Sequence, residues 1–144
     1  MDTIPDDAGD VIDRIDPETT LFILVSKSGT TQETLTNEAF VVEKMREHDI
    51  RGLNPRRHMV AVTSETSPLA RSGEYLDAFF IDDYIGGRYS STSAVGGCVL
   101  SLAFGPEVFE EFLAGAHAGD RAALEPDIGR NAVLLDALIG IYER

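Results

Sequence analysis

Four hydroxyl side chains and a glycine gather in one short turn, Ser26-Lys27-Ser28-Gly29-Thr30-Thr31, directly after an apolar run. A helical pattern follows the turn, and the start of a helix offers unpaired N–H groups and a positive dipole end, which together favour phosphate. Gly29 permits a tight turn and a close approach of the backbone to a ligand. The turn therefore predicts a phosphate site. The alternative is that its hydroxyls only cap the helix, with Thr30 and Glu33 forming a capping box.

A second cluster, Gly86-Gly87-Arg88-Tyr89-Ser90, follows another apolar run further along the chain. Two adjacent glycines let the backbone turn sharply beside a ligand. They place the Arg88 guanidinium between the end of a strand and the start of a helix. A fixed cation there can stabilise negative charge that develops on a substrate oxygen. The alternative is a structural role, in which Arg88 forms an ion pair with a local acid such as Asp82 or Asp83.

Strand and helix patterns alternate along the chain and must position both motifs. We expect strands at 21–25, 59–63 and 78–81, and helices at 10–15, 32–48, 67–76, 91–104, from 106 onward and at 130–144. The run at 21–25 is typical of a strand buried on both faces. This alternation predicts an α/β layered fold with a parallel sheet, in which ligands bind at the carboxyl ends of the strands.

Both motifs resemble those of one known family. The stretch Ser26–Thr34 resembles the sugar-phosphate loop of phosphoglucose isomerases, which commonly reads S-K-[ST]-x-T-T-x-E-[TP], and Asp83–Gly96 is similar to that family's G-G-R-[FY]-S signature. The motifs come in the family's order and at a plausible separation. The resemblance implies a flavodoxin-like sugar isomerase (SIS) domain, a three-layer α/β sandwich with a parallel sheet, over residues 15–144. A polar segment at 1–14 precedes it.

The resemblance also implies which residues do what. The phosphate contacts are expected from hydroxyls and backbone N–H groups of the first motif: Ser26, Lys27, Ser28, Thr30, Thr31 and Thr34. Among them the hydroxyls of Ser26, Ser28 and Thr31 are the principal ligands, the N–H groups near Lys27 and Thr30 assist, and Thr34 is a lesser contact. Arg88 is the expected catalytic residue, which steadies a cis-enediol(ate) as glucose 6-phosphate and fructose 6-phosphate interconvert. The glycines that shape the loops are Gly29, Gly86 and Gly87.

Some parts of the family's active site have no counterpart in the sequence. The family carries a G-x-G-G-S loop upstream of its S-K-[ST] loop, and a catalytic glutamate, a histidine from the partner subunit and a lysine further downstream. We assign none of these roles to Glu125, Glu143 or His117. Only three clear strand patterns are present, so we also expect the sheet to be incomplete. The chain is therefore expected to be an internal part of a longer enzyme, or a truncated gene product, and inactive on its own.

Composition limits the classes of partner. Of the 144 residues, 43% are hydrophobic and 26% are charged, which is ordinary for a globular domain. The net charge of −13 would repel a phosphate backbone, so nucleic acid is not an expected partner. No apolar run approaches the roughly 20 residues that a membrane helix needs. Cys98 is the only cysteine, so no disulfide can form within the chain, and a cytoplasmic setting is expected.

Other parts of the sequence allow further interpretations. The hydroxyl-rich stretch 63–67 is expected to cap a helix through Ser67 rather than to contact substrate. The histidines have no metal-like spacing, and the family needs no metal or organic cofactor. A non-catalytic sugar-phosphate-binding module, or an SIS isomerase of another phosphosugar, stays open as an alternative, although the Gly86–Ser90 loop argues against both. The full-length enzyme is expected to be a homodimer.

Overall fold

The computed structural model describes residues 6–71 and 73–143. The chain divides into two compact units, one that extends to Val99 and one that begins at Leu100. Both motifs and all the strands of the described residues belong to the first unit. The first unit therefore holds the predicted site.

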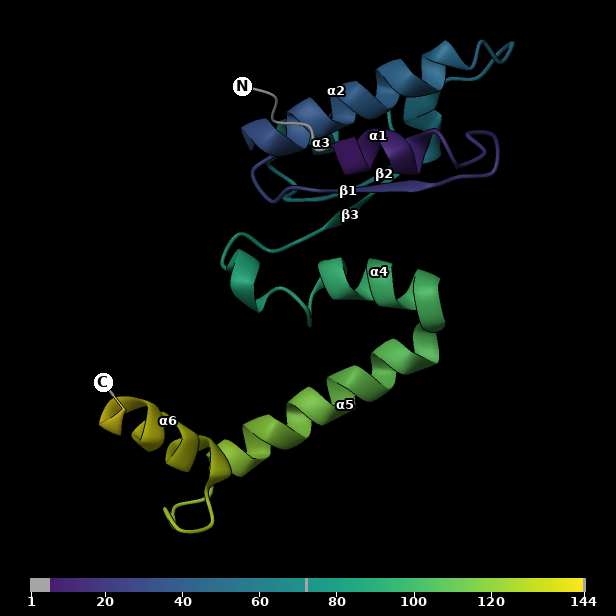
Figure 1. The fold of residues 1–144 in the computed structure, drawn as a ribbon. Helices are drawn as coiled ribbons and strands as arrows, with labels where there is room; N and C mark the ends of the chain where they lie inside the picture. The colour runs from purple at the N-terminus through teal and green to yellow at the C-terminus, as the bar shows by residue number, and fades with distance from the viewer. Residues whose placement is uncertain (1–5, 72, 144) are drawn as a thin grey trace. The chain divides into compact units, whose positions relative to one another are not determined.

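The first unit is built on a parallel sheet of three strands, β1 (Phe22–Val25), β2 (Met59–Thr63) and β3 (Asp77–Phe80), in the order β1-β2-β3 (Figure 1). Phe22 is in register with Met59, and Val60 with Asp77. The predicted α/β class and parallel sheet are confirmed. Because all three strands run the same way, their carboxyl ends lie at one edge of the sheet.

The helices of this unit follow the predicted pattern with some shifts at their ends. Their bounds are α1 (Asp6–Ile12), α2 (Gln32–Glu47), α3 (Pro68–Arg71) and α4 (Ala94–Phe104), which crosses into the second unit, with short 3₁₀ helices η1 (Pro55–His58) and η2 (Gly87–Tyr89). The helix expected at 10–15 therefore begins and ends earlier. The helix expected at 67–76 ends at Arg71, because Gly73 adopts a φ of +59°, which no right-handed helix can continue.

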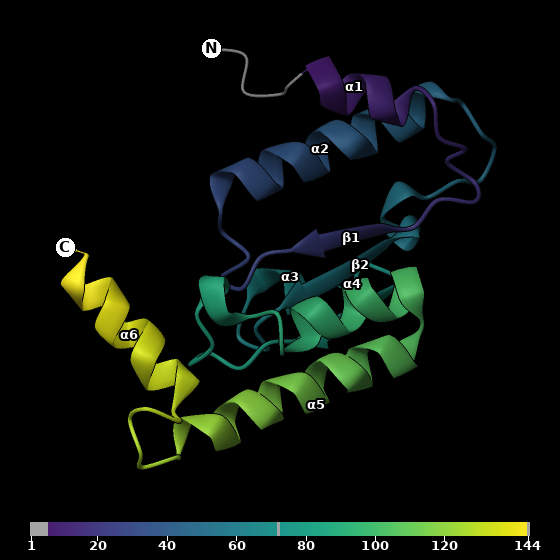
Figure 2. The same ribbon diagram turned by 60° about the horizontal axis from the view of Figure 1, so that its bottom comes forward.

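The hydrophobic core lies between one face of the sheet and the helices α2 and α3. Alternate residues of the strands share this face: Phe22, Leu24, Met59, Ala61 and Ala78. They pack against Leu35, Val41 and Val42 of α2, Leu69 of α3, and Tyr75. Figures 1 and 2 show α1 along α2 on this side of the sheet, and a β-carbon at Gly9 would lie 3.9 Å from Phe40 Cζ. Burial of this apolar face is the main favourable contribution to folding.

The outer position of β1 overturns one expectation. The run at 21–25 was expected to be buried on both faces, and β2 is indeed buried at every position. In the described residues, however, β1 pairs only with β2, and Val25 is 38% exposed. The physical reason is that an edge strand has a neighbouring strand on one side only, so its side chains are covered less than those of the central β2.

A buried carboxylate links α2 to the segments on either side of β2. Glu38 is only 7% exposed, and its Oε1 accepts hydrogen bonds from Arg56 Nε (3.0 Å) and from the Tyr75 hydroxyl (2.9 Å). Arg56 also pairs with the Glu74 carboxylate. A buried charge is tolerated where it is paired and hydrogen-bonded in this way. The cluster therefore fixes α2 over the sheet.

The second unit contains α5 (Pro106–Ala123) and α6 (Ala132–Tyr142), which contact each other. Pro106 opens α5, as predicted for a proline at the first helical position. Asn131 begins α6: its Oδ1 accepts from Leu134 N (2.9 Å), and its Nδ2 donates to the carbonyls of Ala123 and Glu125. Among the described residues, no helix is long and apolar enough to cross a bilayer.

Candidate active site

The first motif forms the turn between β1 and α2, and Ser26 is its buried anchor. The Ser26 side chain is 6% exposed; its Oγ accepts from Gly29 N (3.2 Å) and donates to Thr31 Oγ1 (3.3 Å). Its backbone N–H donates to Val62 O (3.1 Å), so the sheet hydrogen bonding continues one residue beyond β1. The turn, residues 26–31, is called the phosphate loop below. Its first hydroxyl is thus held in place by both the sheet and the turn itself.

The capping box expected at Thr30 and Glu33 does not form. Thr31 is the N-cap of α2, and no side chain caps it. The Thr30 N–H and hydroxyl instead both donate to Ser28 Oγ, at 3.2 and 3.0 Å. The alternative that these hydroxyls serve only to cap the helix is therefore not supported. Ser28, Thr30 and Thr31 are exposed, which leaves their hydroxyls open to a ligand at the helix N-terminus.

Gly29 brings the phosphate loop against the start of α3. Its φ is +66°, in the left-handed region that favours glycine. A β-carbon at this position would lie 2.1 Å from Ser67 Oγ and 3.0 Å from Leu69 Cγ. Ser67 Oγ accepts from Leu69 N (3.1 Å), which confirms the predicted capping role of Ser67. The close approach predicted for Gly29 is thus made to the start of α3.

The second motif follows β3 and is called the arginine loop, residues 82–90. Gly87, Arg88 and Tyr89 form η2, and Ser90 Oγ donates to Gly87 O (2.7 Å). Arg88 is exposed and forms no ion pair in the part of the chain that the structure describes. The acids considered as its partners are engaged elsewhere, since Asp82 accepts from the Tyr84 hydroxyl and Asp83 from Ser64 Oγ. The guanidinium of Arg88 is therefore available to a ligand.

Direct hydrogen bonds join the two loops at the carboxyl edge of the sheet. Lys27 Nζ donates to Asp83 O (3.0 Å) and to Ile85 O (2.8 Å). Ser64, at the end of β2, donates its N–H to Lys27 O (3.0 Å) and its hydroxyl to the Asp83 carboxylate. Thr63 Oγ1 adds a hydrogen bond to Ser26 O (2.6 Å). The ends of β1, β2 and β3 are thus connected through side chains.

Three of these anchoring roles were missed from the sequence. The stretch 63–67 was assigned to capping alone, yet Thr63 and Ser64 hold the two loops, and no anchoring role was expected of Asp83. Their one sequence signal was position, since each lies at or just beyond the carboxyl end of a strand. Thr34, the remaining predicted contact, is half-buried in the first turn of α2.

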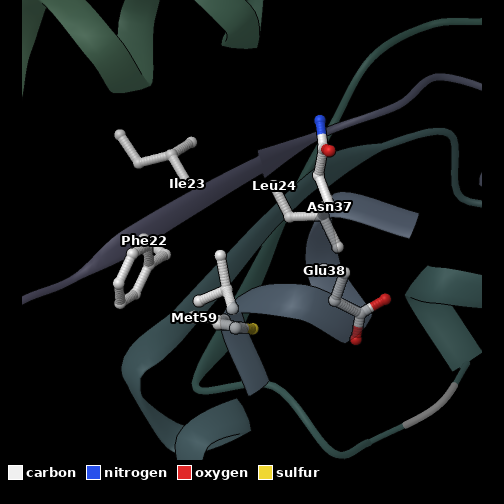
Figure 3. Close-up of a pocket in the computed structure, with 7 residues that line it drawn as sticks. Phe22, Ile23, Leu24, Asn37, Glu38 and Met59 are labelled. Atoms are coloured by element: carbon white, nitrogen blue, oxygen red, sulfur yellow. The ribbon is translucent and has the colours of Figure 1, made fainter. Parts of the chain in front are cut away.

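Other groups of chemical interest lie outside this site. Among the described residues, no three histidine, cysteine or acidic side chains are grouped so as to hold a metal ion. Burial raises the pKa of the half-buried Cys98 thiol, which makes it less reactive. A pocket of about 130 Å³ lies between β1, β2 and α2 (Figure 3). It is lined mostly by apolar side chains, with Asn37 and Glu38, and by no residue of either loop.

Comparison with known proteins decides the family. A family model described as phosphoglucose isomerase matches residues 4–144. The chain belongs to the phosphoglucose isomerase family. This member is 63% identical over 140 residues to a glucose-6-phosphate isomerase of Treponema pallidum (strain Nichols), and 58% identical to one of Treponema denticola. Each match covers 97% of the chain and 26% of the relative, so the chain spans about a quarter of the length of these curated relatives.

Solved structures confirm the fold of this phosphoglucose isomerase family member. It matches a glucose-6-phosphate isomerase from Chlamydia trachomatis with a TM-score of 0.90 and 47% sequence identity, over 97% of this chain and 26% of that one. It also matches a hypothetical protein from Thermus thermophilus, with a TM-score of 0.79 and 35% identity, over 95% of this chain and 32% of that one. The predicted family and the predicted SIS-type α/β fold are both confirmed.

Proposed function

We propose that this chain supplies the phosphate-binding loop and the active-site arginine of a glucose-6-phosphate isomerase. The observation that carries the proposal is that a hydroxyl-rich helix start and an exposed arginine loop are joined at one edge of a parallel sheet by Lys27. Sugar-phosphate chemistry needs both an anion site and a cation near the reacting carbons. The 63% identity to an isomerase of that name supports the same assignment.

The substrate phosphate lies at the N-terminus of α2 in this proposal. Hydroxyls of Ser26, Ser28 and Thr31 bind its oxygens, the backbone N–H groups of Lys27 and Thr30 assist, and the helix dipole adds to the attraction. The Ser26 Oγ stays in place in this account, and only its O–H, which donates to Thr31 Oγ1 in this structure, rotates toward the phosphate. Thr34 contributes at longer range from the first turn of α2.

Arg88 acts at the other end of the sugar. Isomerisation moves a proton between C1 and C2 through a cis-enediol(ate), and negative charge develops on an oxygen in that step. An arginine held beside this oxygen stabilises the charge without moving a proton itself. Gly86 (φ −77°, ψ 146°) is extended and Gly87 opens η2, and neither has a positive φ, so the sharp glycine turn expected of this pair is not observed. The reaction, as implied for this family, uses no metal or organic cofactor.

The base that moves the proton and the histidine that assists ring opening belong to other regions of the family's enzymes. The complete enzyme is proposed to be a cytoplasmic homodimer that acts in glycolysis and gluconeogenesis. Sugar phosphate is its partner in this account, and nucleic acid and membranes are not. A net charge of −13 requires local attraction for an anionic substrate, which this proposal assigns to the N–H groups at the start of α2 and to Arg88.

A binding comparison tests the role of Arg88. A phosphorylated sugar hydroxamate, which resembles the enediolate, should bind the full chain, and Arg88→Met should weaken that binding roughly 10–100-fold while leaving inorganic phosphate affinity nearly unchanged. Arg51→Met is the matched control, because Arg51 is exposed in the loop that leads toward the opposite end of β2. Equal effects of Arg88→Met on both ligands, or none on either, would favour the non-catalytic sugar-phosphate-binding module.

A further inference from the structure

The ammonium group of Lys27 has a defined set of protein partners. Lys27 belongs to the phosphate loop, yet its Nζ donates to two backbone carbonyls of the arginine loop, Asp83 O (3.0 Å) and Ile85 O (2.8 Å). The two loops follow β1 and β3, which are not neighbours in the sheet, because β2 lies between them. The Lys27 side chain therefore spans the end of the central strand to reach its acceptors.

From this geometry we infer that Lys27 is a positioning residue, whose side chain sets the place of the arginine loop relative to the phosphate loop rather than binding phosphate itself. This inference rests on the proposed function. Ile85 O is the last anchored atom before Gly86 and Gly87, and Arg88 follows directly. With Ile85 held, η2 (Gly87–Tyr89) starts from a fixed point, and the range of positions open to the Arg88 guanidinium is reduced.

The chemistry of a lysine suits this role. Its ammonium is a compact charge with three N–H donors on a flexible stem, so it can serve two carbonyls from one atom. A second link between the loops runs through Ser64, at the end of β2. Its N–H donates to Lys27 O and its hydroxyl to the Asp83 carboxylate, which holds the arginine loop two residues before Ile85. The Lys27 ammonium does not pair with the carboxylate of Asp82 or Asp83. The Asp82 carboxylate accepts from the Tyr84 hydroxyl, and the Asp83 carboxylate accepts from Ser64 Oγ. Preorganisation of a charged group in this way lowers the reorganisation needed during reaction.

The sequence offers a matched control. Lys44 is the only other lysine of the chain, and it lies on α2, where it pairs with Glu47. Lys44→Met removes the same charge as Lys27→Met without touching either loop. Lys27→Arg keeps a positive charge and several donors at the original position. The three variants together separate the hydrogen bonds of Lys27 from its charge.

Amide hydrogen exchange on the full chain, without ligand, measures the positioning directly. Lys27→Met should speed exchange at the amides of Ile85 and Tyr89 about tenfold or more, since it removes two charge-assisted hydrogen bonds. Lys44→Met should leave these rates unchanged, and Lys27→Arg should restore much of the protection. The amides of β2 (Met59–Thr63) serve as the internal reference. Unchanged rates at Ile85 and Tyr89, or an equal increase in β2, would overturn the inference.

Titration with inorganic phosphate and with glucose 6-phosphate completes the test. In Lys27→Met, amides 26–31 should still respond to both ligands, whereas amides 86–89 should lose their response to the sugar phosphate. Loss of the phosphate response with the arginine loop unchanged would overturn the inference in favour of a direct phosphate ligand. If the unmodified chain binds neither ligand, the proposed function fails, and the hydrogen exchange comparison still decides the structural role of Lys27.

Discussion

Gly29 lies so close to Ser67 that a β-carbon on the glycine would come within 2.1 Å of the serine hydroxyl. The phosphate loop therefore rests directly on the residue that caps α3, and only a glycine fits between them. Its φ of +66° is unfavourable for any residue with a β-carbon. Position 29 is thus restricted twice, by conformation and by space.

Gly29→Ala should lower the free energy of unfolding by about 2–5 kcal/mol, the sum of a left-handed backbone and an overpacked contact. Gly52→Ala is the control, because Gly52 also has a positive φ (+85°) but nothing within 4 Å of its β-carbon position. It should lose only about 1–2 kcal/mol. Urea denaturation of both variants measures the difference. Equal losses would show that the contact with Ser67 is unimportant.

Tyr75 gives the chain a pH dependence in the alkaline range. Burial, reinforced by its hydrogen bond to the Glu38 carboxylate, raises the pKa of Tyr75 from 10.0 to about 12. The folded state thus favours the neutral phenol, and the stability that this provides is complete below pH 10 and is lost as the pH rises toward about 12. Tyr75→Phe should flatten the fall in unfolding free energy over this interval. A fall of the same size in the variant would contradict the assignment, and tyrosinate absorbance checks the pKa itself.

The open edge of β1 should promote self-association. In the described residues β1 has no partner on its outer side, and both Leu21 (41%) and Val25 (38%) are exposed. Apolar edges of this kind recruit other chains, while the net charge of −13 opposes association until salt screens it. Sedimentation should therefore show an association that grows with salt concentration.

A charge on that edge provides the control for this prediction. Val25→Lys should reduce the association, because lysine on an edge strand discourages pairing. Val11→Lys makes the same change of charge on α1, at a side chain that is 61% exposed, and should have little effect. A monomer at every salt concentration, with a sharp unfolding transition at high temperature, would show that the β1 edge is covered.

The chain on its own should show no measurable isomerase activity. Transfer of a proton between C1 and C2 needs a general base, which typically contributes ~10²–10⁴-fold, and no residue of the two loops is proposed for that role. A coupled assay on chain purified from a host without its own isomerase measures this. Asp83 is the acid to replace first, because it contacts the anchoring residues Lys27 and Ser64. If the chain shows activity and Asp83→Asn abolishes it, Asp83 is an overlooked base.

Much of the fold could be predicted from the sequence because its signals are local. The apolar run at 59–63 and the helical spacing of Leu35, Val42 and Met45 are enough to predict β2 and α2. The placement of both loops at one edge follows from the rule that parallel strands end together. The end of α3 could not be predicted, because it depends on the backbone conformation at Gly73. Glycine can adopt several backbone conformations, so its presence alone does not say which one occurs.

The contacts within the site were less predictable, because they depend on residues far apart in the chain. The Lys27 ammonium donates a hydrogen bond to the Ile85 carbonyl, 58 residues further along the chain. The two residues meet only because of the way the strands are arranged in the sheet. The expected capping box was wrong because the N-cap of α2 is Thr31 rather than Thr30, and the Thr30 N–H and hydroxyl both donate to Ser28 Oγ. Local competition between hydroxyls of this kind is not visible in a motif.

The central claim is that the phosphate loop and the arginine loop form one sugar-phosphate site. Titration of the full chain with glucose 6-phosphate, followed by amide NMR shifts, tests it most directly, with unphosphorylated glucose as the control. The account predicts that the largest shifts fall at residues 26–34 and 86–90, and that glucose alone produces little change. Largest shifts elsewhere in the chain, or equal shifts with glucose, would contradict it.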